Sequence, residues 1–171
     1  ATGAGLFVLI TAFANISGAH LNPFVSLSMY LTKRIKGKEL LTFIPAQILG
    51  CLLGVMLANV FFEHSIIELS TKNRDGFHIF LSEIVATFGL IFIIFATLKD
   101  GKTTVAACVA TYISAGYWFT SSTSFANPAV AIARTFTDSF TGINYLNTPT
   151  YIFAELLGAI VAIYIIKRLI K

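Results

Sequence analysis

Long apolar stretches dominate this sequence and limit what it can fold into. A helix that crosses a lipid bilayer needs about 20 mostly apolar residues, and five stretches meet or approach that length. They are residues 1–16, 40–62, 78–98, 103–120 and 151–170, with polar or charged segments between them. Only 12% of the residues are charged, against about 25% in soluble domains. We therefore expect an all-α membrane protein with five transmembrane helices.

Two shorter apolar stretches, residues 23–31 and 128–136, each follow an asparagine and begin with proline. Asparagine is a strong helix N-cap, and proline suits the first helical position, where a missing N–H has no consequence. Both stretches are too short to cross a bilayer. They are predicted to be half-length helices that start abruptly after Asn22 and Asn127.

The sequence around the two Asn-Pro pairs is duplicated. Residues 17–25 read SGAHLNPFV and residues 124–130 read SFANPAV, while PAQILG at 45–50 corresponds to FAELLG at 153–158. An odd number of predicted spans separates the copies, so the copies enter the membrane from opposite sides. Inverted repeats with broken helices at corresponding positions indicate a substrate path near the membrane midplane.

The duplication predicts one transmembrane channel domain over residues 1–171, with a partial first repeat at 1–62 and a second repeat at 78–171. The second repeat opens with a span, residues 78–98, that has no counterpart in the first. The sequence also begins inside an apolar run and without methionine. We therefore expect the first transmembrane helix to be missing and the chain to be a fragment.

Basic residues are distributed unevenly between the predicted loops. Threading the spans alternately places nine of the twelve Lys and Arg residues on one side of the membrane. Loops rich in Lys and Arg face the cytoplasm, so the C-terminus is predicted to be cytoplasmic. The basic residues are grouped by membrane side and do not form the continuous basic stripe that would bind nucleic acid. Nucleic acid is therefore not an expected partner. The nine are Lys33, Arg34, Lys36, Lys38, Lys99, Lys102, Lys167, Arg168 and Lys171.

Residues that could carry catalysis or bind a metal are few. Cys51 and Cys108 lie in apolar runs and are interpreted as small buried hydrophobic residues rather than as a disulfide. His64 and His78 lack metal-ligand spacing, and the sequence contains no nucleophile–base pair or phosphate-binding loop. We expect neither enzymatic activity nor a cofactor.

The two Asn-Pro loops resemble the signature loops of the aquaporin (major intrinsic protein) family. Residues 17–23 and 124–129 carry the resemblance, which extends from that family's second span to its sixth. The sequence of residues 117–140 is similar to that of a bacterial subgroup of this family that is often associated with arsenic-resistance genes. The resemblance implies an aquaporin-like inverted repeat, a homotetramer and a bacterial inner membrane.

The two half-helices would form the centre of such a channel. Each helix start carries roughly half a positive charge, so two starts that meet inside the membrane repel cations. Asn22 and Asn127 would cap these starts through their side-chain oxygens and offer amide N–H groups to passing water. Water held in this way cannot relay a proton. The alternative is that both asparagines are only helix caps.

Four neighbours complete the two signature loops, namely Pro23, Phe24, Pro128 and Ala129. Phe24 stands where the family usually has alanine, and its ring could narrow the pore or fill a packing gap. His20 resembles the family's histidine near the cytoplasmic mouth, although a packed, hydrogen-bonded histidine is an equal alternative.

The resemblance also assigns a narrow selectivity filter toward the outer face. The family normally has an arginine three residues after the second-loop asparagine, and this chain has Val130. Ungapped spacing places the other filter positions at Thr2, Ala115 and Ser124. All are small, so the filter is expected to be wide and weakly polar. Water, glycerol, urea or undissociated arsenous acid would then pass.

Arg134 follows Asn127 by seven residues, nearly two helical turns, and should share its helix face. It is interpreted as a cation in the outer vestibule. The alternatives are a local pair with Asp138 and a contact with a lipid headgroup.

Three polar residues within the spans are predicted to be structural. The resemblance gives Glu83 the role of a buried carboxylate that accepts N–H groups of the second loop, with proton carriage as the alternative. Gln47 and Glu155 correspond across the repeat, and they either brace the half-helices or lie near the bilayer surface.

Two other functions suit the same architecture. A secondary transporter would need ion-coupling carboxylates at mid-membrane and a flux that depends on an ion gradient, whereas Glu83 and Glu155 lie toward the ends of their spans. A non-conducting membrane scaffold would be impermeable to solutes.

Overall fold

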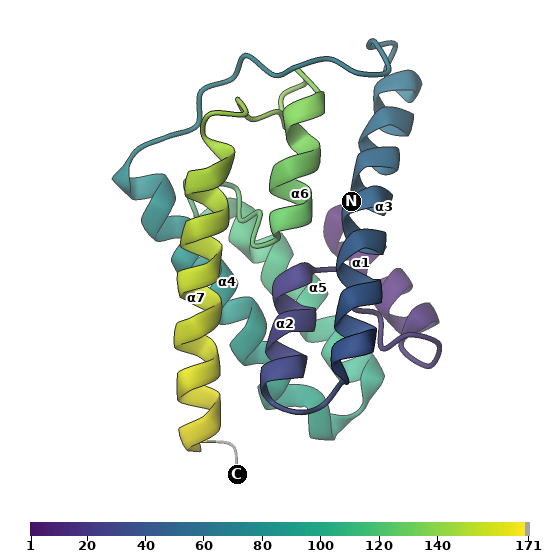
Figure 1. Ribbon diagram of the computed structural model, residues 1–171, viewed down its shortest axis with the longest axis vertical. Coiled ribbons are helices and arrows are strands. Elements are labelled where there is room, and N and C mark those ends of the chain that lie inside the picture. Colours follow the sequence, from purple (N-terminus) through teal and green to yellow (C-terminus); the bar gives the residue numbers. More distant parts are fainter. Residues whose placement is uncertain (170–171) are drawn as a thin grey trace.

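The computed structural model describes residues 1–169, and every regular element within that range is a helix (Figure 1). The all-α expectation is confirmed. The elements are α1 (Thr2–Phe13), α2 (Pro23–Leu31), α3 (Gly37–Phe61), α4 (Phe77–Thr97), η1 (Leu98–Asp100), α5 (Lys102–Phe119), α6 (Pro128–Ala133), η2 (Arg134–Phe136) and α7 (Thr148–Leu169), where η denotes a single 3-10 turn.

Helices occupy all five predicted spans. Three of them, α3, α4 extended by η1, and α7, are long and apolar enough to cross a membrane. Helix α5 has 18 residues and is less apolar, and α1 has 12. Residue 170, the predicted end of the last span, lies outside the described residues.

The half-helices α2 and α6 lie in opposite halves of the molecule, with their starts toward its middle (Figure 1). Both contact α3 and α7, and they also contact each other. Each begins with the predicted proline. Helix α6 is shorter than predicted, because the chain tightens into η2 at Arg134.

The remaining helices pack around this pair. Helix α4 packs on α5 and α7, and α1 packs on α5. Helix α3 is the least covered, since Asn59 is its one buried residue. Its large apolar side chains, among them Leu41, Leu49 and Leu53, are exposed, as suits a surface that faces lipid rather than water.

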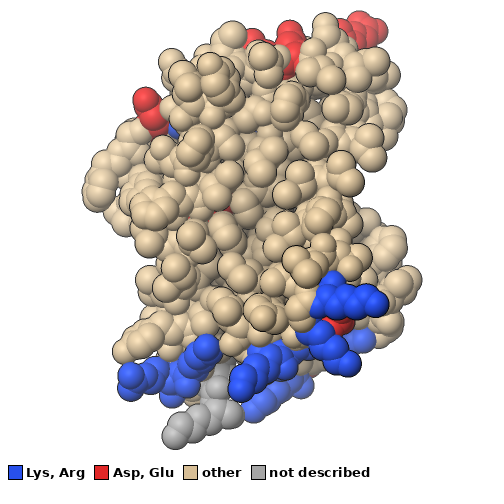
Figure 2. Space-filling view, viewed as in Figure 1, with Lys and Arg blue, Asp and Glu red and all other residues tan. Residues whose placement is uncertain are grey.

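Basic side chains gather at one end of the molecule, and acidic ones lie mostly at the other (Figure 2). The basic end is where α2 is followed by α3, where η1 is followed by α5 and where α7 ends. These places carry eight of the nine residues assigned to the cytoplasmic side, and Lys171 lies outside the described range. The cytoplasmic location of this end stays a prediction.

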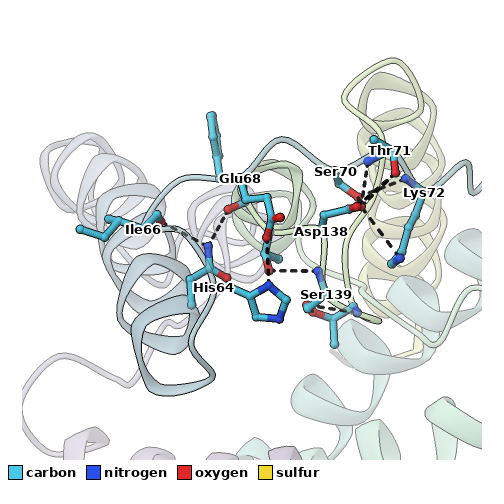
Figure 3. Close-up of polar contacts among 12 residues, drawn as sticks. His64, Ile66, Glu68, Ser70, Thr71, Lys72, Asp138 and Ser139 are labelled. Carbon is cyan, nitrogen blue, oxygen red and sulfur yellow. Dashed lines mark hydrogen bonds and ion pairs between the residues drawn. The ribbon is translucent and has the colours of Figure 1, made fainter.

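Residues 62–76 cross the opposite end and are tied to the segment that follows η2. Asp138 accepts hydrogen bonds at Oδ1 from the Thr71 backbone N–H (2.9 Å) and the Ser70 hydroxyl (3.3 Å), with Lys72 Nζ at 3.9 Å (Figure 3). The Ser70 backbone N–H donates to the carbonyl of Thr135 at 2.9 Å. The carboxylate of Asp138 and backbone hydrogen bonds such as this one therefore act together to attach the crossing segment.

This attachment should weaken in acid. The Thr71 backbone N–H donates to the ionised carboxylate and so lowers the pKa of Asp138 below its ordinary value, about 3.9. A lowered folded-state pKa contributes stability above the ordinary value and loses it as the pH falls through the folded-state pKa. We expect the Thr71 region to exchange amide hydrogen more slowly in the wild type than in Asp138→Asn at about pH 6. The two should become equal near pH 2, and a difference that persists there contradicts the assignment.

Candidate functional site

Two asparagines begin the half-helices with matching geometry. The Phe24 backbone N–H donates to Asn22 Oδ1 at 2.9 Å, and the Ala129 backbone N–H donates to Asn127 Oδ1 at 3.1 Å. Both asparagines have extended backbone angles, φ −153° and −158°. Each side-chain oxygen is thus engaged as a helix cap.

The two loops are joined by reciprocal side-chain hydrogen bonds. Asn22 Nδ2 donates to the Ala126 carbonyl at 2.6 Å, and Asn127 Nδ2 donates to the Leu21 carbonyl at 3.0 Å. An amide nitrogen carries two hydrogens, so each asparagine keeps one N–H beyond this cross-link. The sequence suggested free amide groups, but it gave no sign that half of that capacity joins the loops.

A cavity of about 210 Å³ has both asparagines in its wall. Such a cavity has room for several waters, since each needs about 10–15 Å³. Toward the basic end of the molecule it continues into a second hollow of about 690 Å³, which we call the inner hollow, and the two share His20, Met29 and Val105. The inner hollow also has the charged residues Arg34, Glu39 and Lys102 in its wall.

Three of the four filter residues assigned by spacing, Thr2, Ser124 and Val130, line the cavity, and Ala115 does not. The residues of α5 that line the cavity are Val105, Val109, Ile113 and Tyr117. They recur every four residues and so lie on one face of the helix. Ala115 is two residues from Tyr117, about 200° around the helix, and is exposed. Ala115 therefore lies away from the cavity, and Tyr117 is the residue of this part of α5 that lines it, as the four-residue recurrence in the sequence could have indicated.

Aromatic and cationic side chains line the end of the cavity that lies away from the basic end of the molecule, which we call the outer end. The Arg134 guanidinium carbon lies 4.2 Å from the centre of the Phe125 ring, and Arg74 lies 5.9 Å from the same ring. The Tyr117 hydroxyl donates to Thr2 Oγ1 at 2.8 Å, and Tyr117 lines the cavity together with Arg134. This end of the cavity therefore carries a guanidinium and a phenol hydroxyl beside the small residues assigned by spacing.

Arg134 lines the cavity, as expected for a vestibule cation. The alternative local pair with Asp138 is not formed, because Asp138 is engaged by Thr71 and Lys72 (Figure 3). Within residues 1–169, the contacts between basic and acidic side chains of 4.0 Å or less are His64–Glu68 and Lys72–Asp138. Arg134 is therefore held by the ring of Phe125 and by Tyr117 rather than by an acid.

Other signature residues pack rather than line the cavity. Phe24 is 8% exposed, belongs to the main hydrophobic core and is absent from the cavity wall. Of the two roles considered for its ring, the structure therefore gives the packing role. Pro23, Pro128 and Ala129 are likewise buried outside the cavity wall.

Two buried carboxyl groups brace the second loop. Glu83 Oε1 and Oε2 accept the backbone N–H groups of Phe125 (2.9 Å) and Ala126 (2.7 Å). Glu155 Oε1 accepts the next N–H, that of Asn127, at 3.0 Å. Both carboxyls are 0% exposed. This loop needs such support, since Ala126 has φ 47°, in a region that non-glycine residues seldom adopt.

Gln47 braces the first loop from α3. Its Nε2 donates to the His20 carbonyl and to Ser26 Oγ, the latter at 2.9 Å. The His20 ring lies edge-on to Phe43, with centroids 5.3 Å apart, and its Nδ1 is 3.4 Å from Ser26 Oγ. His20 therefore stands at the inner end of the cavity with its ring fixed.

Comparison with known proteins agrees with the resemblance of the two Asn-Pro loops to the aquaporin family. The family described as "Major intrinsic protein" matches residues 1–119. Aquaglyceroporin AqpS of Rhizobium meliloti (strain 1021) is 44% identical over 171 residues, which is 100% of this chain and 73% of the relative. Aquaporin-4 of Bos taurus is 28% identical and that of Homo sapiens 27%, each over 94% of this chain and 52% of the relative. The chain thus spans about half the length of these two mammalian relatives.

Proposed function

Because this chain belongs to the major intrinsic protein family, we propose that it is a passive channel for water and small neutral solutes that excludes protons and ions. The family consists of channels rather than enzymes, which agrees with the expectation from sequence. One observation carries the proposal: two half-helix starts are cross-linked to each other beside a cavity whose wall holds both asparagines.

Ion exclusion follows from the charges along this path. The starts of α2 and α6 direct positive dipole ends toward the middle of the molecule, and Arg134 adds a guanidinium at the outer end. A cation that enters must leave its hydration shell and meets these positive dipole ends and the guanidinium of Arg134. Water gives its oxygen to the remaining N–H of Asn22 and Asn127, and a water oriented in this way cannot pass a proton along a chain.

The solute class depends on the width of the outer end. Val130 occupies the position of the family's filter arginine, and a valine leaves more room than an arginine. Glycerol and urea are the neutral solutes proposed, and undissociated arsenous acid is a further candidate. The name of the aquaglyceroporin relative supports glycerol.

The assembly and location complete the proposal. The channel is a homotetramer in a bacterial inner membrane, with its basic end and C-terminus in the cytoplasm. Lipid contacts the apolar outer helices. Crosslinking in membranes and accessibility of a C-terminal tag test the two statements separately.

Swelling of proteoliposomes tests the function. Vesicles that contain the protein should swell faster than empty vesicles in isosmotic glycerol or urea, with no change on dissipation of proton or sodium gradients. A flux that requires a gradient would support the secondary transporter instead. Impermeability to every solute would support the scaffold.

Substitution of the filter position provides a matched prediction. Val130→Arg should lower glycerol and urea permeability about tenfold or more, because a long charged side chain enters a cavity of about 210 Å³ already bordered by Arg134. Water permeability should fall less. Ala115→Arg is the control, since Ala115 lies outside the cavity wall, and equal effects of the two substitutions would contradict the proposed filter.

A further inference from the structure

The two carboxyls that brace the second loop accept the N–H groups of consecutive residues, Ala126 and Asn127, and so lie beside each other. We propose that Glu155 is a neutral carboxylic acid, that it donates its proton from Oε2 to ionised Glu83, and that in this form it positions Asn127. Glu155 thus acts through Asn127 as a positioning residue. The protonation state itself does not depend on conduction, whereas the effect on Asn127 rests on the channel function proposed above.

The hydrogen bonds of the pair distinguish the two members. Both oxygens of Glu83 already accept backbone N–H groups, at 2.9 and 2.7 Å, and the Ser122 hydroxyl also reaches this carboxyl. Several donors on one carboxyl favour its ionised form. In Glu155, Oε1 accepts one N–H, and Oε2 is fully buried without a donor among the described residues. A proton on this Oε2 gives both groups a complete set of partners.

Electrostatics also favour a single charge on the pair. The two side chains bind the neighbouring backbone N–H groups of Ala126 and Asn127, and both are 0% exposed. Two carboxylates this close in a dry site cannot both be ionised without a strong penalty. Neither forms an ion pair within residues 1–169.

The ionisable neighbours on surrounding elements do not supply a second positive charge. The Arg134 guanidinium feels the charge of Glu83 and can balance one negative charge, although Phe125 and Tyr117 hold it. Arg74 is bound to the Phe140 carbonyl at 2.6 Å. Tyr112 of α5 donates to the Val85 carbonyl at 3.1 Å. Tyr151 of α7 is a neutral phenol.

The internal repeat supports the same assignment. Gln47, the counterpart of Glu155, is a neutral group that uses its Nε2 as a donor toward the first loop. A protonated glutamic acid resembles glutamine, since each ends in one acceptor and one donor. Both repeats would then brace their half-helix with a neutral side chain at corresponding positions, where Gln47 donates to its loop and Glu155 accepts from its own.

Infrared spectroscopy tests the proton directly. At neutral pH the purified protein in lipid should show the carbonyl band of a protonated carboxylic acid, distinct from carboxylate bands. The band should shift on labelling with ¹³C-glutamate, disappear in Glu155→Gln and persist in Glu63→Gln, whose side chain is exposed. Absence of the band from the wild type, or its survival in Glu155→Gln, overturns the proposal.

Permeability tests the positioning role in the same preparations. Glu155→Ala should lower water permeability at least fivefold, because the Asn127 N–H and Glu83 both lose a partner, and Glu155→Gln should restore most of it. Folding of each variant is verified by thermal unfolding before the assay. Equal losses in the two variants overturn the positioning role. A wild type that shows the band and does not conduct contradicts the channel function alone.

Discussion

Glu83→Ala is expected to abolish permeation and to destabilise the protein strongly. The substitution leaves the buried N–H groups of Phe125 and Ala126 without an acceptor. An orphaned buried donor costs about 1–3 kcal/mol, so the free energy of unfolding should fall by about 2–6 kcal/mol. Thermal unfolding in detergent and water permeability in proteoliposomes measure the two effects.

The reason for the expected loss of permeation lies in the backbone of the second loop. Thr123, Ser124 and Ala126 all have positive φ, between 47° and 64°, and this arrangement delivers Asn127 to the cavity. Without Glu83 the loop can relax to ordinary backbone angles. Glu63→Ala, at an exposed carboxyl, is the control. A Glu83→Ala variant with unchanged stability would show that water or Glu155 satisfies the loop.

Gly158→Val is expected to prevent folding. A Cβ at this position would lie 2.4 Å from the Ile84 carbonyl oxygen and 3.0 Å from the Phe88 nitrogen. These are backbone atoms of α4, so they cannot move aside as a flexible side chain would. Overpacking of a core typically costs about 1–3 kcal/mol, and a backbone collision of this depth should exceed that. The α4–α7 contact also sets Glu83 opposite Glu155.

Gly54→Val is the matched control for this prediction, because a Cβ on Gly54 of α3 meets nothing within 4 Å. The Gly158→Val variant should aggregate or elute as a broad species on size exclusion, while Gly54→Val elutes like the wild type. A monodisperse Gly158→Val protein with an unchanged unfolding temperature would mean that α7 is able to shift along α4.

The sequence predicted the helices because their signals are local. Apolar length identifies the spans, and asparagine followed by proline marks a helix start whatever lies around it. The half-helix α2 therefore has the predicted bounds, Pro23–Leu31. Helix α6 ends early at Ala133, since the tightening at Arg134 depends on tertiary contacts.

The candidate site was predicted in part, and the errors share one cause. Asn22 and Asn127 were identified because duplication marks them, and the resemblance led to Glu83. Ala115 was assigned by counting residues back from Asn127 through a loop. Counting does not register how α5 is rotated, and the rotation brings Tyr117 to the cavity instead.

The sequence by itself determined the helices, their duplication and the two asparagine caps, since each follows from residue type and spacing along the chain. Only the tertiary structure decided which side chains from distant parts of the sequence come into contact. It joined Asn22 to the Ala126 carbonyl, placed Arg134 on Phe125 rather than near Asp138, and brought Glu83 against Glu155. Such contacts link residues far apart in sequence, and their geometry depends on how whole helices pack and rotate, which no local pattern encodes.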